Sequence, residues 1–170
     1  MRKLLGNKLL MGLLLLLLLA AVCLLPFPRR MNVMHQGVLW CCDVPEMEQL
    51  TTVSIKGTYW DYLLLEDKFN GSVQVEALPE THKQISIVPL GEGQFGIWYA
   101  DDEMLMKSFG GMFLQSDGSV MLLIHEDGHW DADTGLMLTA PASTREEAVA
   151  LANKLAGELS PNWLGKWTFE

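Results

Sequence analysis

One uninterrupted apolar segment near the N-terminus constrains this chain more than any other feature. Residues 9–25 form a run of 17 residues without a charged side chain, and Leu13–Leu19 are seven consecutive leucines. As a helix rising about 1.5 Å per residue, the run would be on the order of 25 Å long, near the lower limit for spanning a bilayer. Pro26 and Pro28 follow it. The pattern predicts an N-terminal transmembrane helix at residues 9–25 that contacts the lipid bilayer.

Two other interpretations of this segment stay open. A basic start followed by an apolar run is also typical of a cleaved signal peptide, but Leu19-Ala20-Ala21 has leucine where cleavage needs a small residue. Cys23 is a third option, a lipid-modified cysteine, although Val22 stands where that processing needs a smaller residue. We therefore expect an uncleaved anchor, with secretion after signal cleavage as the alternative.

The predicted anchor divides the chain into three parts. We expect residues 1–30 to be a basic leader and transmembrane anchor, residues 31–50 a stalk, and residues 51–170 a single domain. Three basic residues precede the apolar run and two follow it, so the flanking charges do not decide the orientation, but the α-amino group and the short leader favour a cytoplasmic N-terminus. The prediction is a single-pass protein of the cell membrane, with its C-terminal domain outside the cytoplasm.

Charge is distributed unevenly along the chain. The first 30 residues contain five basic side chains and no acidic one, whereas residues 31–170 contain 7 basic and 21 acidic side chains, a formal net charge of −14. Such a charge repels nucleic acid and anionic lipid head groups. We therefore expect no nucleic-acid partner. The simplest role of the charge is solubility, and the alternative is attraction of a cation or of another envelope protein with a basic surface.

Short stretches of alternating apolar and polar residues follow from residue 51 onwards. In residues 72–77, for example, Val73 and Val75 lie on one face of an extended chain. Asp117-Gly118 separates two such stretches and is typical of a tight hairpin turn, because glycine accepts a positive φ. The expected strands are residues 51–56, 58–65, 72–77, 84–90, 94–100, 111–115, 120–125 and 135–140.

The hydrophobic period changes to that of a helix after Pro141. Ser143 and Glu146 have the spacing of a capping box, which satisfies free N–H groups at a helix start. An apolar stripe follows at helical spacing and suits packing against a sheet; it consists of Ala148, Leu151, Ala152, Leu155 and Leu159. The predicted fold class is therefore α+β: an antiparallel β-meander of about six to eight strands with one C-terminal helix packed on it.

Several motifs in the second half resemble those of a group of small proteins of Firmicutes, which are exported or membrane-anchored behind a basic and apolar leader. The resemblance covers about residues 50–160. It is carried by Phe69-Asn70-Gly71-Ser72-Val73, by Gly128-His129-Trp130-Asp131, by Gly135-Leu136-Met137-Leu138 and by Ala140-Pro141-Ala142-Ser143-Thr144-Arg145-Glu146-Glu147-Ala148. It implies this location and a single α+β domain, and it implies no activity.

The densest group of metal-ligand side chains lies in residues 125–133. The candidate ligands are His125, Glu126, His129, Asp131 and Asp133. Residues 125–129 match the H-E-x-x-H pattern of zinc hydrolases, in which a helix places both imidazoles on one face. Gly128 and the expected strand before it favour a loop instead. The spacing from Asp131 to Gly135 resembles the start of a calcium loop but lacks the later EF-hand ligands.

No other residue set indicates catalysis, and we predict no cofactor beyond calcium or zinc as candidates. Cys41 and Cys42 are adjacent, a spacing that makes a disulfide between them strained. Residues 59–62 and Trp98-Tyr99 are either an aromatic binding face or part of the core. The leading hypothesis is a membrane-anchored binding or accessory domain without catalysis. The alternative is a metal-dependent hydrolase or calcium-binding protein that uses the 125–133 loop.

Overall fold

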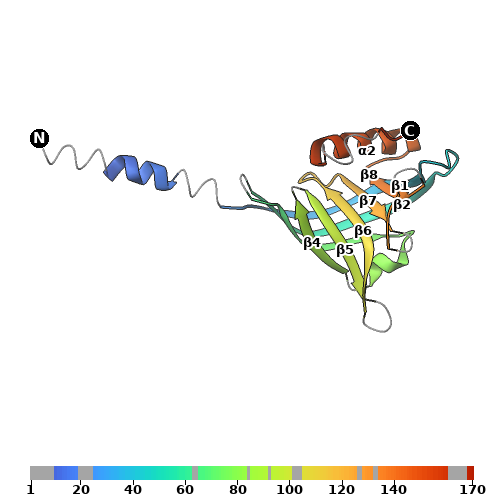
Figure 1. The fold of residues 1–170 in the computed structure, drawn as a ribbon, viewed down its shortest axis with the longest axis horizontal. Helices are drawn as coiled ribbons and strands as arrows, with labels where there is room; N and C mark the ends of the chain where they lie inside the picture. The colour runs from blue at the N-terminus through green and yellow to red at the C-terminus, as the bar shows by residue number, and fades with distance from the viewer. Residues whose placement is uncertain are drawn as a thin grey trace, which may run out of the picture.

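The described part of the chain forms one antiparallel sheet and a helix that packs on it (Figure 1). The computed structural model describes residues 10–18, 25–62, 65–83, 85–91, 93–100, 105–125, 128–131, 134–160 and 168–170. Eight strands in these ranges have the spatial order β3-β2-β1-β8-β7-β6-β5-β4. The expected α+β class, with an antiparallel meander and a C-terminal helix, is confirmed.

Nearly every strand pairs with its neighbour in sequence, as short connections between antiparallel strands favour. The exception is the pairing of β8 with β1, which joins the two ends of the meander. The elements are β1 (Phe27–Cys41), β2 (Gln49–Asp61), β3 (Lys68–Val75), β4 (Ile85–Gly91), β5 (Gln94–Ala100), β6 (Met106–Leu114), β7 (Val120–Ile124), β8 (Leu136–Ala140), the 3-10 helix η1 (Pro79–His82) and α2 (Arg145–Leu159).

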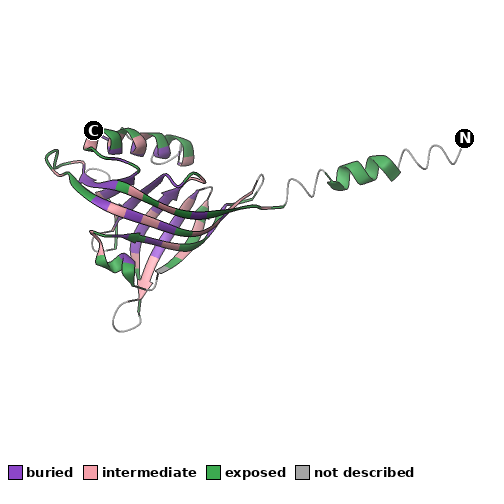
Figure 2. Ribbon diagram, turned by 180° about the vertical axis from the view of Figure 1, so that it is seen from behind, coloured by how far each residue is buried: buried purple, intermediate pink, exposed green. Residues whose placement is uncertain are grey.

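The sheet curls into a nearly closed barrel. Its two edge strands, β3 and β4, lie next to each other without a ladder between them among the described residues. The ring of Phe95 on β5 makes edge-to-face contacts with Tyr59 on β2 and Phe69 on β3, each at 6.3 Å between centroids. Since β5 lies near the opposite end of the strand order from β2 and β3, these contacts cross the interior of the curled sheet. The concave side is therefore a packed core (Figure 2).

A second core lies between the convex side of the sheet and α2. It contains Val38, Trp40, Phe113, Met121, Leu123, Met137, Ala142, Ala148, Ala152, Leu155, Ala156 and Phe169. All five residues of β7 are buried, because its side chains alternate between the two cores. The predicted apolar stripe of the helix is confirmed as the face that packs on the sheet, with Ala148, Ala152 and Leu155 fully buried.

The helix cap lies one residue later than the sequence predicts. Thr144 is the N-cap and accepts a hydrogen bond from the Glu147 backbone N–H at 3.3 Å. The Glu147 carboxylate in turn accepts from the Ser143 backbone N–H at 2.8 Å and from its hydroxyl at 2.6 Å, and these bonds lower the pKa of Glu147. Ser143–Glu146 and Thr144–Glu147 share the same spacing, so spacing alone could not select the correct pair.

The Thr144→Ala variant should lose about 1 kcal/mol of unfolding free energy, because the first turn of α2 loses its side-chain acceptor. Urea denaturation followed by far-UV circular dichroism measures this loss. Thr144→Ser keeps the hydroxyl and should retain the original stability. An equal loss in both variants would show that the threonine methyl group, rather than the cap, carries the effect.

The N-terminal region differs from its sequence-based interpretation. Residues 31–41 of the predicted stalk belong to β1, which pairs with both β2 and β8. Met34 is an apolar residue on the exposed face, and His35 is a polar residue opposite the buried Val53, so the strand lacks a clear alternation and the sequence pattern missed it. The segments predicted as separate strands at 51–56 and 58–65 are joined in β2, which extends to Asp61.

The predicted transmembrane helix is not confirmed. Positions 10–18 are helical, and among the described residues no helix has both the length and the apolar character required to cross a membrane. Residues 19–24 of the apolar run lie outside the described residues, as do Trp163 and Trp167 of the tail.

Candidate functional site

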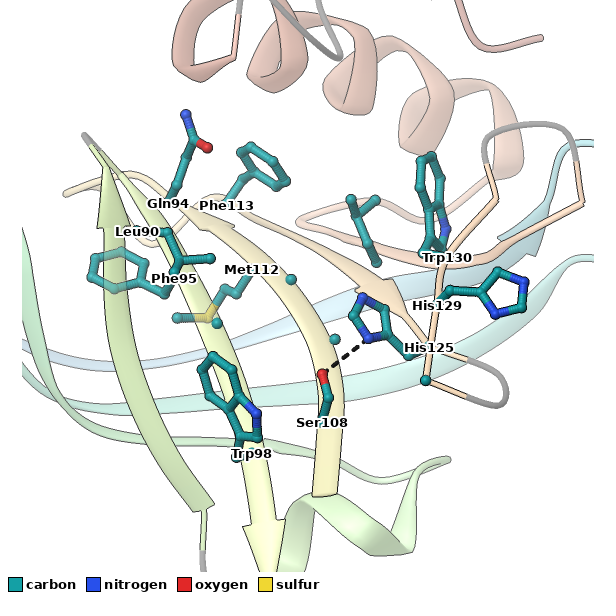
Figure 3. Close-up of a pocket in the computed structure, with 15 residues that line it drawn as sticks. Leu90, Gln94, Phe95, Trp98, Ser108, Met112, Phe113, His125, His129 and Trp130 are labelled. Carbon is teal, nitrogen blue, oxygen red and sulfur yellow. Dashed lines mark hydrogen bonds between the residues drawn. The ribbon is translucent and has the colours of Figure 1, made fainter. Parts of the chain in front are cut away.

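A pocket of about 390 Å³ opens on the convex side of the sheet. It lies over β5, β6 and the end of β7, beside the area that α2 covers (Figure 3). Its lining residues are Leu90, Gln94, Phe95, Gly96, Trp98, Ser108, Gly110, Gly111, Met112, Phe113, Leu123, His125, Gly128, His129 and Trp130.

The floor of the pocket consists of two glycines on neighbouring strands. Gly96 of β5 and Gly111 of β6 are partners in the antiparallel ladder. Phe95 and Ile97 point into the inner core, so Gly96 between them faces outwards. Phe113 packs in the outer core, which places Gly111 on the same outer face. Neither position carries a side chain, so only neighbouring residues can cover the backbone here.

The two floor glycines respond differently to an added side chain. A Cβ on Gly96 would lie 2.3 Å from the six-membered ring of Trp98. That indole therefore lies directly over Gly96, and only glycine permits this position. A Cβ on Gly111 would meet only Leu123, at 3.8 Å, which is an ordinary contact. The space above Gly111 is thus the open part of the pocket.

Apolar rings form the walls. Trp98 comes from β5, Phe113 from β6 and Trp130 from the segment after β7. Trp130 makes an edge-to-face contact with the buried ring of Phe169, with centroids 6.5 Å apart and an interplanar angle of 77°. Gly135 also lies close to this ring, because a Cβ added to Gly135 would be 2.3 Å from Trp130 Nε1. Contacts with the outer core therefore fix the position of the Trp130 wall.

A hydrogen-bonded pair forms the polar end of the pocket. Ser108 Oγ lies 2.9 Å from His125 Nδ1, and Figure 3 shows the two side chains facing each other beside Trp98. The β5–β6 register shifts after Ile97, which leaves Phe109 in the inner core and Ser108 opposite Trp98. Burial, followed by the nearby His129, lowers the pKa of His125.

The lowered pKa of His125 predicts a loss of stability in acid. The folded domain protonates His125 only at a lower pH than the unfolded chain does. The neutral His125 ring therefore makes its full contribution to the free energy of unfolding above the unfolded pKa of about 6.5. This contribution is lost as the pH falls from there through the folded-state pKa. Urea denaturation between pH 7.5 and 5 should show a shallower decline for His125→Gln. An unchanged decline would assign the pH dependence to other groups.

The structure brings only part of the predicted metal group into the pocket. His125 and His129 both line it, but in the view of Figure 3 their side chains leave the chain in opposite directions. The Asp131 carboxylate accepts a hydrogen bond from the Thr134 backbone N–H at 3.1 Å. Glu126 and Asp133 lie outside the described residues.

Within the described residues, no group of three or more His, Cys, Asp and Glu side chains could hold a metal ion. Because two of the five candidate ligands fall outside that part of the chain, the metal site at residues 125–133 stays a prediction. The same holds for calcium or zinc as its occupant.

The predicted aromatic face is divided between the two sides of the sheet. Tyr59 is buried on the inner side, where its hydroxyl donates to Asp67 at 2.5 Å, whereas Trp98 lines the outer pocket. Neither Cys41 nor Cys42 forms a disulfide. The Cys41 thiol faces Asp43, and burial raises its pKa.

Sequence reasoning did not identify Ser108 or the two floor glycines. The available signal was the glycine between Phe95 and Ile97, together with Gly110-Gly111 in the next strand. Glycine inside a strand marks a close approach of another group or a bend. The sequence alone could not show that these glycines are cross-strand partners.

The fold and the site together define a curled antiparallel sheet with an external helix and an apolar pocket on its convex side. The chain matches no protein-family model, and neither a curated protein nor a solved structure is significantly similar to it.

Proposed function

We propose that this protein is a membrane-anchored, extracytoplasmic binding domain without catalysis, and that its convex-side pocket holds a small, largely apolar ligand. The anchor rests on the apolar run at residues 9–25, and its orientation rests on the α-amino group and the short leader before that run. The pocket volume of about 390 Å³ lies within the range of roughly 300–1,000 Å³ that is typical of small-molecule sites.

The observation that carries this proposal is the glycine floor, open above Gly111, between aromatic walls. The core on this side of the sheet continues under α2, yet it stops at Gly111, where the backbone is open to the pocket. The Trp98 and Trp130 rings flank this open space, and a ligand bound there would remove their exposed apolar surface from water. Apolar walls with a few polar groups are the usual composition of a ligand site.

A substitution at Gly111 tests the proposal directly. Isothermal titration of naphthalene-2-carboxamide, a flat neutral probe, into the full chain should give saturable binding. Gly111→Leu places a branched side chain in the open part of the pocket without a backbone clash, so it should reduce affinity at least about tenfold, since steric exclusion removes most of the contact area.

Gly157→Leu is the matched control. Gly157 lies on the exposed side of α2, where an added Cβ meets nothing within 4 Å, so this variant should bind the probe like the original chain. All three chains are titrated in the same nonionic detergent, so partition of the probe into micelles contributes equally to each titration. No saturable binding to the original chain, or equal binding to Gly111→Leu, would contradict a ligand site in this pocket.

Hydrolysis at the polar end is a second candidate function. The contact of 2.9 Å between the Ser108 hydroxyl and His125 is the arrangement that activates a serine nucleophile. The described residues show no carboxylate on the other ring nitrogen of His125, which is why binding is the better-supported function. Labelling by a fluorophosphonate that Ser108→Ala abolishes would support hydrolysis, and no labelling of the original chain would oppose it.

A further inference from the structure

The chemistry of the polar end points to a class of ligand. We propose that the pocket binds a flat, largely apolar ring compound that carries one anionic group, with the ring over Gly111 and the anion on the Ser108–His125 pair. This inference rests on the proposed binding function and names the ligand class for that site.

The flat shape follows from the floor and walls. The Gly96–Gly111 pair is a strip of backbone, and the Trp98 ring already lies over one half of it. The other half, above Gly111, is open towards Leu123 and Trp130. A planar ring can lie on this strip and contact the Trp130 and Trp98 rings at its edges, an arrangement that aromatic groups favour.

The Ser108–His125 pair presents a hydrogen-bond donor in either tautomer. If the Ser108 hydroxyl donates to His125 Nδ1, the Nε2 atom carries the single N–H proton of the neutral ring and can donate to a ligand. If Nδ1 carries the proton and donates to Ser108 Oγ, the hydroxyl hydrogen becomes available instead. The pair therefore suits a ligand group that only accepts, such as a carboxylate.

The charges around the pocket support the same assignment. None of the described lining residues is acidic, although residues 31–170 carry a formal net charge of −14. The titratable side chains of the lining are His125 and His129. The polar or indole side chains that β5 and β6 contribute are Gln94, Trp98 and Ser108, none of which titrates, and α2 contributes no lining residue. The Gln94 amide N–H donates to the Leu159 carbonyl, and the lining also contains the indole N–H groups of Trp98 and Trp130. Glu126 and Asp127 lie outside the described residues.

The inference is tested with two probes of the same shape. Naphthalene-2-carboxylate and naphthalene-2-carboxamide share one ring system, and only the first is an anion. At pH 7.5 the full chain should bind the carboxylate at least about tenfold more tightly, as expected for a hydrogen bond to a charged group.

Two variants assign the effect to the pair. At pH 7.5, His125→Gln and Ser108→Ala should each weaken binding of the carboxylate more than binding of the carboxamide, because the ring contacts with both probes remain. Near-UV circular dichroism of each variant confirms that the fold is intact.

The outcomes separate this inference from the proposed function. If the carboxamide binds in a Gly111-dependent manner and the carboxylate binds no more tightly, the ligand class is wrong and the binding function stands. Equal losses of affinity for the two probes in both variants would also overturn the assignment of the anion to the Ser108–His125 pair. If neither probe shows binding that Gly111→Leu removes, both the inference and the proposed function fail.

Discussion

Replacing Gly110 by alanine is expected to cause a large loss of the free energy of unfolding. Gly110 has a φ of 157°, and a Cβ there would lie 1.9 Å from the carbonyl oxygen of Leu123. That oxygen belongs to the backbone of β7, which is paired with β6 on one side and β8 on the other, so it cannot move without breaking a ladder. We expect a loss of at least about 4 kcal/mol, in the range of severe backbone clashes.

Gly111→Ala provides the matched control on the adjacent residue. Its added Cβ points to the opposite side of β6 and meets Leu123 at 3.8 Å, so its stability should change by less than about 1 kcal/mol. Urea denaturation of both variants and of the original chain measures the difference. Similar losses at the two positions would show that strand flexibility, rather than the clash with Leu123, decides the outcome.

Removing the Trp40 side chain should have the second largest effect. Trp40 is fully buried between the sheet and α2. Its Nε1–H donates to Thr139 Oγ1 at 3.1 Å, and its ring packs edge-to-face on Phe169 with centroids 5.9 Å apart. The Arg145 guanidinium lies 5.3 Å from the ring centre. Trp40→Ala should cost about 3–5 kcal/mol, because a large cavity opens where three elements meet.

Two further variants divide this loss into packing and hydrogen bonding. Trp40→Phe keeps an aromatic ring but leaves the hydroxyl of the fully buried Thr139 without its donor, which should cost about 1–3 kcal/mol. Combining it with Thr139→Val removes that orphaned hydroxyl and should recover part of the loss. Denaturation by urea measures all three. A Trp40→Ala loss below that of Trp40→Phe would contradict the packing role.

Local patterns were sufficient to predict most of the secondary structure. The alternation at residues 94–100 coincides with β5, and Asp117-Gly118 lies in the β6–β7 hairpin, where Gly118 has a φ of 92°. The helical stripe likewise identified the buried face of α2. These features depend on a period of two or 3.6 residues or on one turn, which a short stretch of sequence contains in full.

The tertiary structure alone decided which strands and residues meet. The β8–β1 pairing joins segments about one hundred residues apart, and it places Trp40 beside Thr139 in the outer core. Alternation reveals that a strand has two faces, but it does not reveal that both faces of β7 are buried.

The candidate site depends on register in the same way. Gly96 meets Gly111, and Ser108 meets His125, only because the β5–β6–β7 ladder aligns these positions around one irregularity after Ile97. A shift of one residue would turn each of these side chains to the other face of the sheet. By itself, the sequence determined most of the strands, the hairpin and the helix of this protein, but not β1. Long-range pairing and the curl of the sheet determined its pocket, because register is set by contacts that no local pattern contains.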